Sequence, residues 1–272
     1  MTDLSRRLAL HTWSVDTTPL GDALTAARAS GFDAVELRRI DFTRCHDAGL
    51  GNEQVLDLVK ASGMTVAVLG TEYGLLFADG AERRRLFDVL ELTCRNAVAL
   101  GCPMIMTAPG QNAGTLEQAG LSLREAAQVA EAHGLRLALE FNSRHDVINH
   151  LEVAREIIAK AGHPAAGLLL DAYHLQRSGS PGRGFEHVAP EEIFTFQYSD
   201  VPPGPPPGQR RPTDRLIPGQ GIVQWKGVFD LLREKGYDGY LSFEAPNPLL
   251  WARPPAEVVR EAAEATRRLL SA

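Results

Sequence analysis

One pattern recurs along the 272-residue chain and limits what it can fold into. An amphipathic segment ends in a small residue and a glycine, two or three residues follow, and an aliphatic run begins, as in ARASGFDAVEL, VKASGMTVAVL, VALGCPMIMTA, AEAHGLRLALEF, AKAGHPAAGLLLD and REKGYDGYLSFE. Glycine after a helix adopts the left-handed cap at low steric cost. The aliphatic runs alternate too little for half-exposed strands, so they predict strands buried on both faces, as in a parallel sheet covered by helices.

The units recur about every 30 to 40 residues, which suits a parallel strand with its crossover helix. The pattern predicts eight strands, at Leu8–Ser14, Ala34–Leu37, Thr65–Leu69, Met104–Thr107, Arg136–Glu140, Gly167–Asp171, Ile193–Tyr198 and Tyr240–Glu244. It predicts helices between them, at Pro19–Ala29, Asn52–Ser62, Ala81–Leu100, Leu116–His133, Leu151–Ala161, Val228–Lys235 and Pro255–Leu270. One short turn is expected at Tyr173–Arg177, and another begins at Pro190–Glu192.

Eight strand–helix units predict an α/β fold, a closed (β/α)₈ TIM barrel that forms a single domain over residues 1–272. A doubly wound open sheet is the alternative, and it is disfavoured because the first strand lacks a phosphate-binding GxGxxG turn. Six prolines lie between Val201 and Pro212, so this stretch cannot be helical. We expect residues 201–221 to form a proline-rich loop over the catalytic face of the barrel.

Three acidic residues close three of the aliphatic runs: Glu140 in LALEF, Asp171 in LLLDAYH and Glu244 in LSFEAP. The carboxyl ends of parallel strands open on one mouth, so the three carboxylates should converge there, which is costly without a cation. Gln197, near the end of strand seven, adds an amide oxygen. This oxygen-rich set predicts one divalent metal ion, Mn²⁺ or Mg²⁺, with Co²⁺ or Zn²⁺ as alternatives. A lone acidic residue at a strand end is usually a solvated rim residue, so repetition over consecutive strands carries the argument.

Four further residues are expected at the mouth. His174, three residues after Asp171, is expected to act as an acid or to bond a substrate hydroxyl, with a supporting or helix-capping role as the alternative. Arg215 is expected to bind a carboxylate or phosphate, with a solvated side chain as the alternative. His11 and Glu72, after strands one and three, are expected to contact substrate, although packing roles suit their positions equally well. Two other arginines of the loop are expected to be solvated, Arg210 and Arg211.

Charge and cysteine content exclude several classes of partner. A net charge of −6 argues against nucleic acid and against an anionic membrane surface, both of which need a basic face. The sequence shows no apolar stretch of membrane-spanning length and no cleavable signal, so we expect no membrane association. Three cysteines, Cys45, Cys94 and Cys102, fit no zinc motif. We expect reduced structural thiols and therefore a cytoplasmic location.

These residues together resemble the xylose isomerase-like TIM-barrel superfamily, which includes sugar phosphate isomerases and epimerases, ketose 3-epimerases, inosose dehydratase, 3-dehydroshikimate dehydratase and endonuclease IV. The resemblance covers essentially the whole chain, including the loop DRLIPGQGIVQW. It implies metal ligands at Glu140, Asp171, Gln197 and Glu244, and substrate contacts at His174 and Arg215. Members of the family often form homo-oligomers, so the resemblance also allows a homo-oligomer of this chain. The epimerases usually have histidine where this chain has Gln197, and a glutamine there resembles some bacterial 3-dehydroshikimate dehydratases.

Three functions fit these features. The first is isomerisation or epimerisation of a small polyhydroxylated carbonyl substrate, a sugar or sugar phosphate, with Glu140 and Glu244 exchanging a proton through an enediolate beside the metal. The second is a dehydratase, in which the enolate expels a β-hydroxyl and His174 is the acid. The third is a non-catalytic sugar-binding barrel, disfavoured because both glutamates are present. An endonuclease IV-like function is disfavoured because the strand ends are poor in histidine and the net charge is negative.

Overall fold

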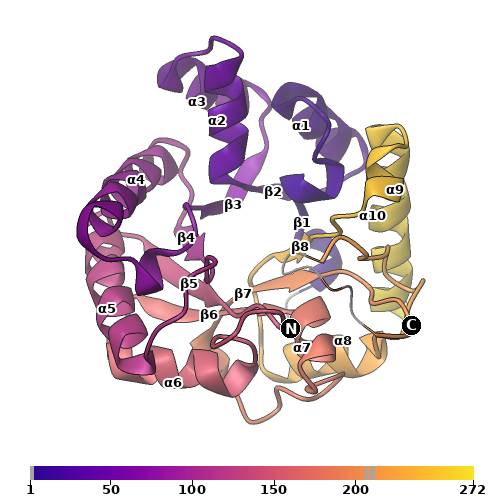
Figure 1. Cartoon of the computed structure of the whole chain (residues 1–272). Helices are drawn as coiled ribbons and strands as arrows, with labels where there is room; N and C mark the ends of the chain where they lie inside the picture. The colour runs from indigo at the N-terminus through magenta and orange to yellow at the C-terminus, as the bar shows by residue number, and fades with distance from the viewer. Residues whose placement is uncertain (1–2, 206–207, 209–211) are drawn as a thin grey trace.

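Eight parallel strands close into a barrel in the computed structural model, which describes residues 3–205, 208 and 212–272. The strands pair in sequence order and β8 returns to β1, as the view along the barrel in Figure 1 shows. They are β1 Leu8–His11, β2 Ala34–Leu37, β3 Thr65–Gly70, β4 Met104–Thr107, β5 Arg136–Glu140, β6 Ala166–Asp171, β7 Ile193–Tyr198 and β8 Leu241–Phe243. The predicted closed barrel is confirmed, and the doubly wound alternative is wrong.

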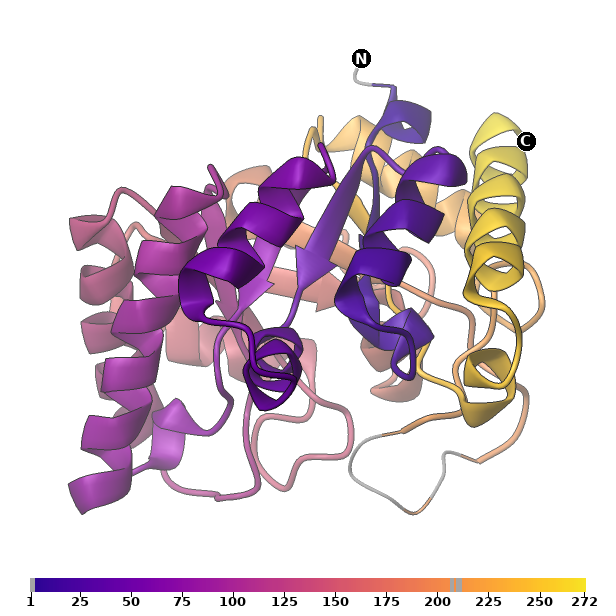
Figure 2. The same cartoon turned by 90° about the horizontal axis from the view of Figure 1, so that it is seen from above.

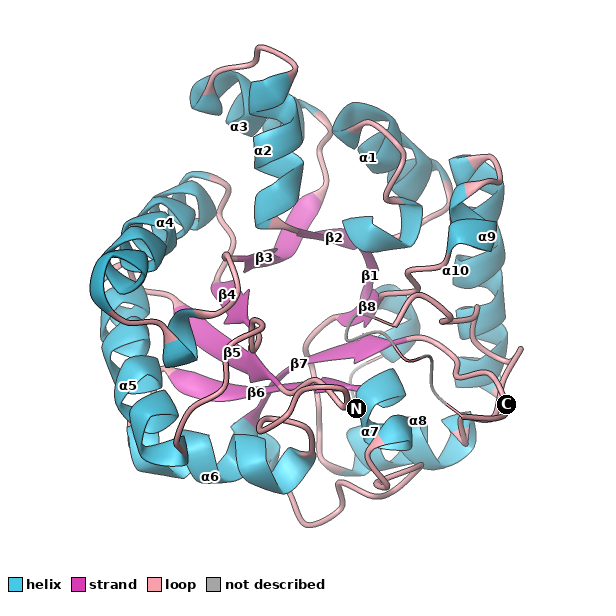
Figure 3. Cartoon of the chain, viewed as in Figure 1, coloured by secondary structure: helices cyan, strands magenta, loops and turns pink. Residues whose placement is uncertain are grey.

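Helices form a ring around the barrel, which Figure 3 shows in cyan around the magenta strands. They are α1 Leu20–Ala29, α2 Arg39–Asp47, α3 Asn52–Ala61, α4 Gly80–Ala99, α5 Leu116–Ala132, α6 Leu151–Ala161, α7 Ala172–Arg177, α8 Trp225–Glu234, α9 Pro248–Trp251 and α10 Pro255–Ser271. Strands β1, β2, β4 and β6 to β8 are buried along their whole length, because helices cover the outer face and side chains fill the interior. None of the described helices combines the length and apolar character needed to cross a membrane.

Glycine ends helices where the sequence pattern predicts a left-handed cap. Gly162 directly follows α6 with φ 55° and ψ 39°, and its N–H donates to the carbonyl of Ile158 at 3.0 Å. Gly236, shortly after α8, has φ 68°. A residue with a Cβ is disfavoured in this region of backbone space. The recurring small residue and glycine therefore mark the points where helices give way to the next strand.

Two element boundaries differ from the sequence predictions by a turn of chain. β1 ends at His11 rather than Ser14, because a 3₁₀ turn begins at Thr12. α8 begins at Trp225 rather than Val228, because the indole of Trp225 packs in the core beside Tyr198. The two short elements predicted after strand six are confirmed, as α7 and as a 3₁₀ turn at Pro190–Glu192.

Helix α2 has no counterpart among the predicted helices. Its segment RIDFTRCHD carries few apolar residues, so the periodicity that marks the other helices is weak. The carboxylate of Asp41 stabilises its first turn by accepting hydrogen bonds from the backbone N–H and the guanidinium of Arg38, each at 2.8 Å. Polar capping rather than apolar spacing begins this helix.

The parallel arrangement gathers the strand ends at one mouth. That mouth faces the lower side of the barrel in Figure 2, whereas both termini lie near the upper side. β5 and β6 end in Glu140 and Asp171, Gln197 lies one residue before the end of β7, and Glu244 directly follows β8. Side chains that are far apart in the sequence therefore share one small region.

One carboxylate ties the loop after β7 to the barrel. Asp200 is fully buried, and its two oxygens accept hydrogen bonds of 2.7 to 3.0 Å from N–H groups of Val201, Gly219, Val223 and Trp225. Asp200 and Leu216 also exchange two backbone hydrogen bonds. Pro212 and Arg215 reach the mouth from this loop, whereas Arg210 and Arg211 lie outside the described residues.

We expect Asp200→Ala to destabilise the protein by about 3–5 kcal/mol, because it leaves several buried N–H groups without an acceptor. The loop should also become sensitive to proteolysis near residues 201–223, because these N–H groups hold it. Urea unfolding and limited trypsin digestion measure the two effects. The control is Asp230→Ala, which removes a surface carboxylate of α8 paired with Lys226. Equal unfolding midpoints for the two variants would contradict the anchoring role of Asp200.

Candidate functional site

A cavity of about 300 Å³ opens at the mouth of the barrel. Glu140 and Glu244 both line it, together with His174 of α7 and Arg215 of the loop after β7. Its outer wall includes Trp13, Glu72, Tyr73 and Pro212. Two of the predicted ligands, Asp171 and Gln197, lie fully buried outside this wall.

The guanidinium of Arg215 lies between two carboxylates. Its Nη1 is 2.6 Å from Asp171 Oδ2 and 2.8 Å from Glu244 Oε2, and the group stacks on the Tyr173 ring at 4.5 Å from the centroid. Only 1% of Arg215 is exposed, so the alternative of a solvated arginine is wrong. Asn247 holds its backbone by donating to the Arg215 carbonyl at 2.9 Å. The buried cation offsets part of the cost of desolvating two carboxylates.

Hydrogen-bond donors reach both nitrogens of the His174 ring. Arginine can only donate, so the 3.1 Å contact from Arg215 Nη2 makes His174 Nε2 an acceptor. At the other nitrogen, the backbone N–H of Ser143 donates to Nδ1 at 3.2 Å, and Ser143 Oγ lies 2.9 Å from the same atom. Burial, and after it the charge of Arg215, lowers the pKa of His174 well below 6.5. The helix-capping alternative is wrong, because Asp171 caps α7 by accepting from the N–H of Tyr173 at 2.8 Å.

His11 lies against Glu244 and outside the cavity wall. The backbone N–H of Trp13 donates to its Nδ1 at 3.1 Å, so the proton of the neutral ring is on Nε2. Nε2 is 3.2 Å from Glu244 Oε1. Burial lowers the pKa of His11 well below 6.5. The ring therefore orients Glu244, and direct contact of His11 with a substrate stays a prediction.

Glu36, near the end of the second strand, is not among the predicted ligands or catalytic residues, but it contacts one of them. Glu36 is fully buried on β2, and its Oε1 accepts a 2.8 Å hydrogen bond from Gln197 Nε2. Burial raises the pKa of Glu36 to about 8. The signal in the sequence is an acidic residue inside the otherwise aliphatic strand AVEL. Its partner is 161 positions away, so the sequence pattern alone does not reveal the pair.

Buried acidic groups outnumber the buried cation of this region. The carboxyl groups are those of Glu36, Glu140, Asp171 and Glu244, and the cation is Arg215. Burial, together with the charges of Glu244 and Asp171, raises the pKa of Glu140 well above 4.5. Burial also raises the pKa of Asp171 to about 6, although Arg215 opposes it. The cluster needs protons or a further cation to be stable at neutral pH.

Two overlapping groups of side chains are suited to a metal ion: the four predicted ligands, and a group that includes His174. Glu140, Asp171 and His174 each offer one ligand atom, and these atoms lie within 4.8 Å of one another. Gln197 Oε1 is buried and accepts no hydrogen bond from the described residues, while its Nε2 is held by Glu36. A buried carbonyl oxygen without a donor is costly, and a cation beside it would remove that cost. The ligand role of Glu244 and Gln197 stays a prediction, and the geometry adds His174 as a candidate.

Glu72 reaches the cavity from the loop after β3, but its carboxylate is already engaged. Arg85 of α4 donates to both of its oxygens, at 2.5 and 3.0 Å. The pair is largely exposed, so it contributes little to stability. Contact of Glu72 with substrate stays a prediction.

The three cysteines lie away from this chemistry. Cys45, Cys94 and Cys102 are free and buried. Burial raises the pKa of Cys94 and of Cys102 to about 12, so both thiols stay protonated at neutral pH. This fits the structural role that the sequence predicts.

With this geometry established, similarity to known proteins becomes informative. The xylose isomerase-like TIM barrel family matches residues 24–269. The chain belongs to this family. The match covers most of the barrel, from α1 to the end of α10, and agrees with the resemblance carried by the strand-end residues.

Curated relatives in the family have several activities. An inosose isomerase of Halalkalibacterium halodurans is 29% identical over 150 residues, which is 55% of this chain and 53% of the relative. A 3-dehydroshikimate dehydratase of Pseudomonas aeruginosa is 30% identical over 255 residues, which is 86% of this chain and 37% of the relative. The chain thus spans about half or less of the length of these relatives.

Solved structures confirm the fold of the family. The IolI protein, solved with a bound zinc atom, superposes with a TM-score of 0.87 at 20% identity, and the match covers 97% of this chain and 98% of the other. An L-ribulose 3-epimerase superposes with a TM-score of 0.79 at 20% identity and covers 100% of this chain and 95% of the other. At this identity the likeness establishes the barrel fold alone.

We expect the protein, with a chelator present, to lose stability as the pH rises from 4.5 to about 8. The pKa of Glu36 is about 8 in the folded chain and 4.5 without the protein environment, so folding takes up a proton between these values. The stability carried by Glu36 is complete below pH 4.5 and is lost as the pH rises through 8. Each pH unit in this window changes the free energy of unfolding by about 1.4 kcal/mol.

Urea unfolding at a series of pH values measures this dependence. Glu36→Gln stays neutral, so its stability should change less across the window. Glu257→Gln, an exposed residue of α10, is the matched control and should behave like the unmodified chain. A Glu36→Gln variant with the same pH dependence as the unmodified chain would contradict the burial of a proton at Glu36.

Proposed function

We propose that this protein is a divalent-metal-dependent isomerase or epimerase that acts on a sugar or sugar phosphate through an enediolate. One observation carries the proposal. Glu140, at the end of β5, and Glu244, directly after β8, line the same cavity, and the charge of Glu244 helps to raise the pKa of Glu140. Two carboxylates on one small cavity can remove and return a proton.

The residues present suit a divalent cation. Oxygen atoms of Glu140, Asp171, Gln197 and Glu244 would hold it, with His174 Nε2 as a further candidate. When bound, such a cation polarises a substrate carbonyl and makes the adjacent C–H more acidic. Oxygen ligands favour Mn²⁺ or Mg²⁺, with Co²⁺ or Zn²⁺ as alternatives. The excess of buried carboxyl groups over Arg215 supports a bound cation on electrostatic grounds.

The chain's own residues would move the proton and orient the substrate. One glutamate takes the proton from the carbon beside the carbonyl, which leaves an enediolate. The other glutamate, protonated beforehand, delivers its own proton, to the opposite face of the same carbon in an epimerisation or to the former carbonyl carbon in an isomerisation. His11 donates to Glu244 and keeps that carboxylate facing the cavity. His174 and Arg215 line the cavity and would bond substrate hydroxyls.

A dehydratase is the second candidate, and two observations favour it. Gln197 stands where epimerases usually have histidine, and the similarity to the Pseudomonas dehydratase covers 86% of this chain. In this reaction the same proton abstraction is followed by loss of a β-hydroxyl, which needs an acid. The lowered pKa of His174 works against that role in the metal-free protein, because the ring is neutral at neutral pH. A non-catalytic sugar-binding barrel is disfavoured by the presence of both glutamates.

The cellular setting follows from the sequence and stays a prediction. We propose a small-molecule substrate, a cytoplasmic location, and no nucleic-acid or membrane partner. A homo-oligomer is compatible with the family resemblance.

We expect solvent deuterium to appear in one member of a panel of ketoses, ketose phosphates, inososes and 3-dehydroshikimate when the protein is incubated with Mn²⁺ in D₂O. NMR and mass spectrometry identify the carbon and the product. Deuterium in a product of unchanged formula supports the isomerase or epimerase, and loss of water supports the dehydratase. EDTA should abolish the exchange and added Mn²⁺ should restore it. Full activity of the chelated protein, or no exchange in any compound, would overturn the proposal.

We expect Glu140→Gln and Glu244→Gln each to lower kcat by about 10²–10⁴-fold, because each removes a proton acceptor. Each variant should also bind Mn²⁺ more weakly, which titration calorimetry measures independently of turnover. Glu257→Gln is the control and should change neither quantity. Unchanged Mn²⁺ affinity with lost turnover would restrict the two glutamates to proton transfer, and unchanged turnover would exclude them from the chemistry.

A further inference from the structure

A second cavity, of about 440 Å³, borders the cavity at the mouth. The two share three wall residues, Trp13, Glu72 and Tyr73. The second cavity extends from them between the loops that follow β1, β2 and β3. A substrate held beside Glu140 and Glu244 could therefore extend a substituent past this wall.

Three arginines line the second cavity, and two of them are neutralised. Arg38 pairs with Asp16 at 2.7 Å and with Asp41 at 2.8 Å. Arg44 pairs with the same Asp16 at 3.0 Å. The charges of Asp16 and Asp41 therefore neutralise those of Arg38 and Arg44. The ion pairs hold the wall in place without leaving a net charge for a ligand.

Arg39 is the arginine whose charge is not compensated. It makes no ion pair with any residue that the structure describes, and its side chain donates to the neutral hydroxyl of Thr43. Its Nε is buried and has no acceptor among the described residues. A guanidinium that is partly buried without an anion is unfavourable, and an oxyanion is the ligand that its planar set of donors fits. Arg39 is thus the arginine of this cavity wall whose charge no described carboxylate neutralises through an ion pair.

The first turn of α2 places Arg39 at the edge of the cavity. α2 starts at Arg39, and both Arg39 and Ile40 line the cavity, so the amino-terminal end of the helix faces it. The amino-terminal end of a helix carries a partial positive charge that favours anions. The carboxylate of Asp41 already lies at this helix end, so the guanidinium of Arg39 is the group left to bind a ligand.

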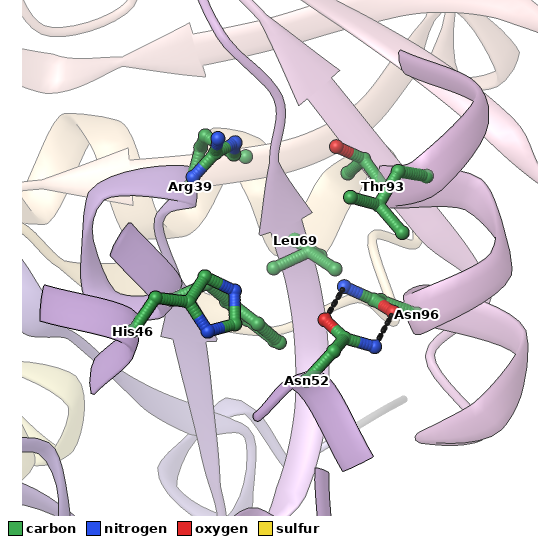
Figure 4. Close-up of a pocket in the computed structure, with 9 residues that line it drawn as sticks. Arg39, His46, Asn52, Leu69, Thr93 and Asn96 are labelled. Atoms are coloured by element: carbon green, nitrogen blue, oxygen red, sulfur yellow. Dashed lines mark hydrogen bonds between the residues drawn. The ribbon is translucent and has the colours of Figure 1, made fainter. Parts of the chain in front are cut away.

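The opposite side of Arg39 offers no room for a ligand. Figure 4 shows Arg39 at the edge of a small pocket with Leu69 and Thr93. This pocket holds about 10 Å³, which is room for about one water molecule. Its amides Asn52 and Asn96 are paired with each other at 2.9 and 3.1 Å. An anion must therefore reach Arg39 from the larger cavity.

We propose that the second cavity is a subsite that binds an oxyanion substituent of the substrate, a phosphate or carboxylate, through Arg39. The inference rests on the proposed function, since it takes the cavity at the mouth as the place of reaction. It narrows the substrate class to sugars or polyols that carry an anionic group remote from the reacting carbonyl. Arg215 does not serve this purpose, because Asp171 and Glu244 already neutralise it.

The test titrates the chelator-treated full chain with inorganic phosphate and, separately, with acetate, by isothermal calorimetry. We expect saturable binding of at least one anion, and the preferred anion identifies the substituent. Arg39→Gln should weaken that binding about tenfold or more, and Arg39→Lys should restore part of it. The control is Arg84→Gln, which removes an exposed charge from α4 and should leave the affinity unchanged. Circular dichroism establishes that each variant is folded.

No saturable binding of either anion would overturn the subsite, as would equal affinities of the Arg39→Gln variant and the unmodified chain. The outcome is independent of the reaction, because Glu140→Gln should retain anion binding while it loses turnover. An inactive protein that binds phosphate through Arg39 would therefore refute the proposed function and leave the subsite standing. If the protein is active but the Arg39→Gln variant binds the anion as tightly as the unmodified chain, the subsite is refuted and the proposed function stands.

Discussion

The ion pairs of Arg215 with Asp171 and Glu244 determine much of the mouth of this barrel. Two buried carboxylates are tolerable only beside a cation, and the guanidinium is held at 2.6 and 2.8 Å from them. That cation comes from a loop, so the loop itself must be fixed. Asp200 provides the anchor by accepting several N–H groups in the interior. A buried acid just after β7 thus positions the cation that neutralises acids on β6 and after β8.

The fold and the main acidic residues could be predicted from the sequence because they follow from short-range patterns. Aliphatic runs after glycine identify buried parallel strands, and the carboxyl ends of such strands must share one mouth, so Glu140, Asp171 and Glu244 could be grouped without a structure. The contacts of Glu36 and His11 could not be predicted. Glu36 meets Gln197 and His11 meets Glu244 only after the barrel closes and β8 pairs with β1.

Helix α2 shows a different limit of sequence patterns. Its segment lacks the apolar spacing of an ordinary amphipathic helix, and polar interactions between Arg38 and Asp41 begin it instead. The charged residues that weaken the helical pattern in the sequence also line the second cavity, among them Arg38, Arg39 and Arg44. A charged stretch that resembles a solvated loop in the sequence is therefore a partly buried structural element, and the uncompensated Arg39 becomes visible only once the ion pairs of its neighbours are known.

The wall shared by the two cavities separates the place of proton transfer from the place where an anionic substituent would bind. Glu72 borders both cavities, and an ionised carboxylate there would repel an anionic substituent on its way to Arg39. Arg85 binds both oxygens of Glu72 and offsets part of this charge, since it also binds Glu82. The buried carboxyl groups of the site lie on the side that handles the proton, and the guanidinium of Arg39, which has no ion pair with the described residues, lies on the side that would hold the anion. Such a separation orients a substrate that is neutral at one end and charged at the other.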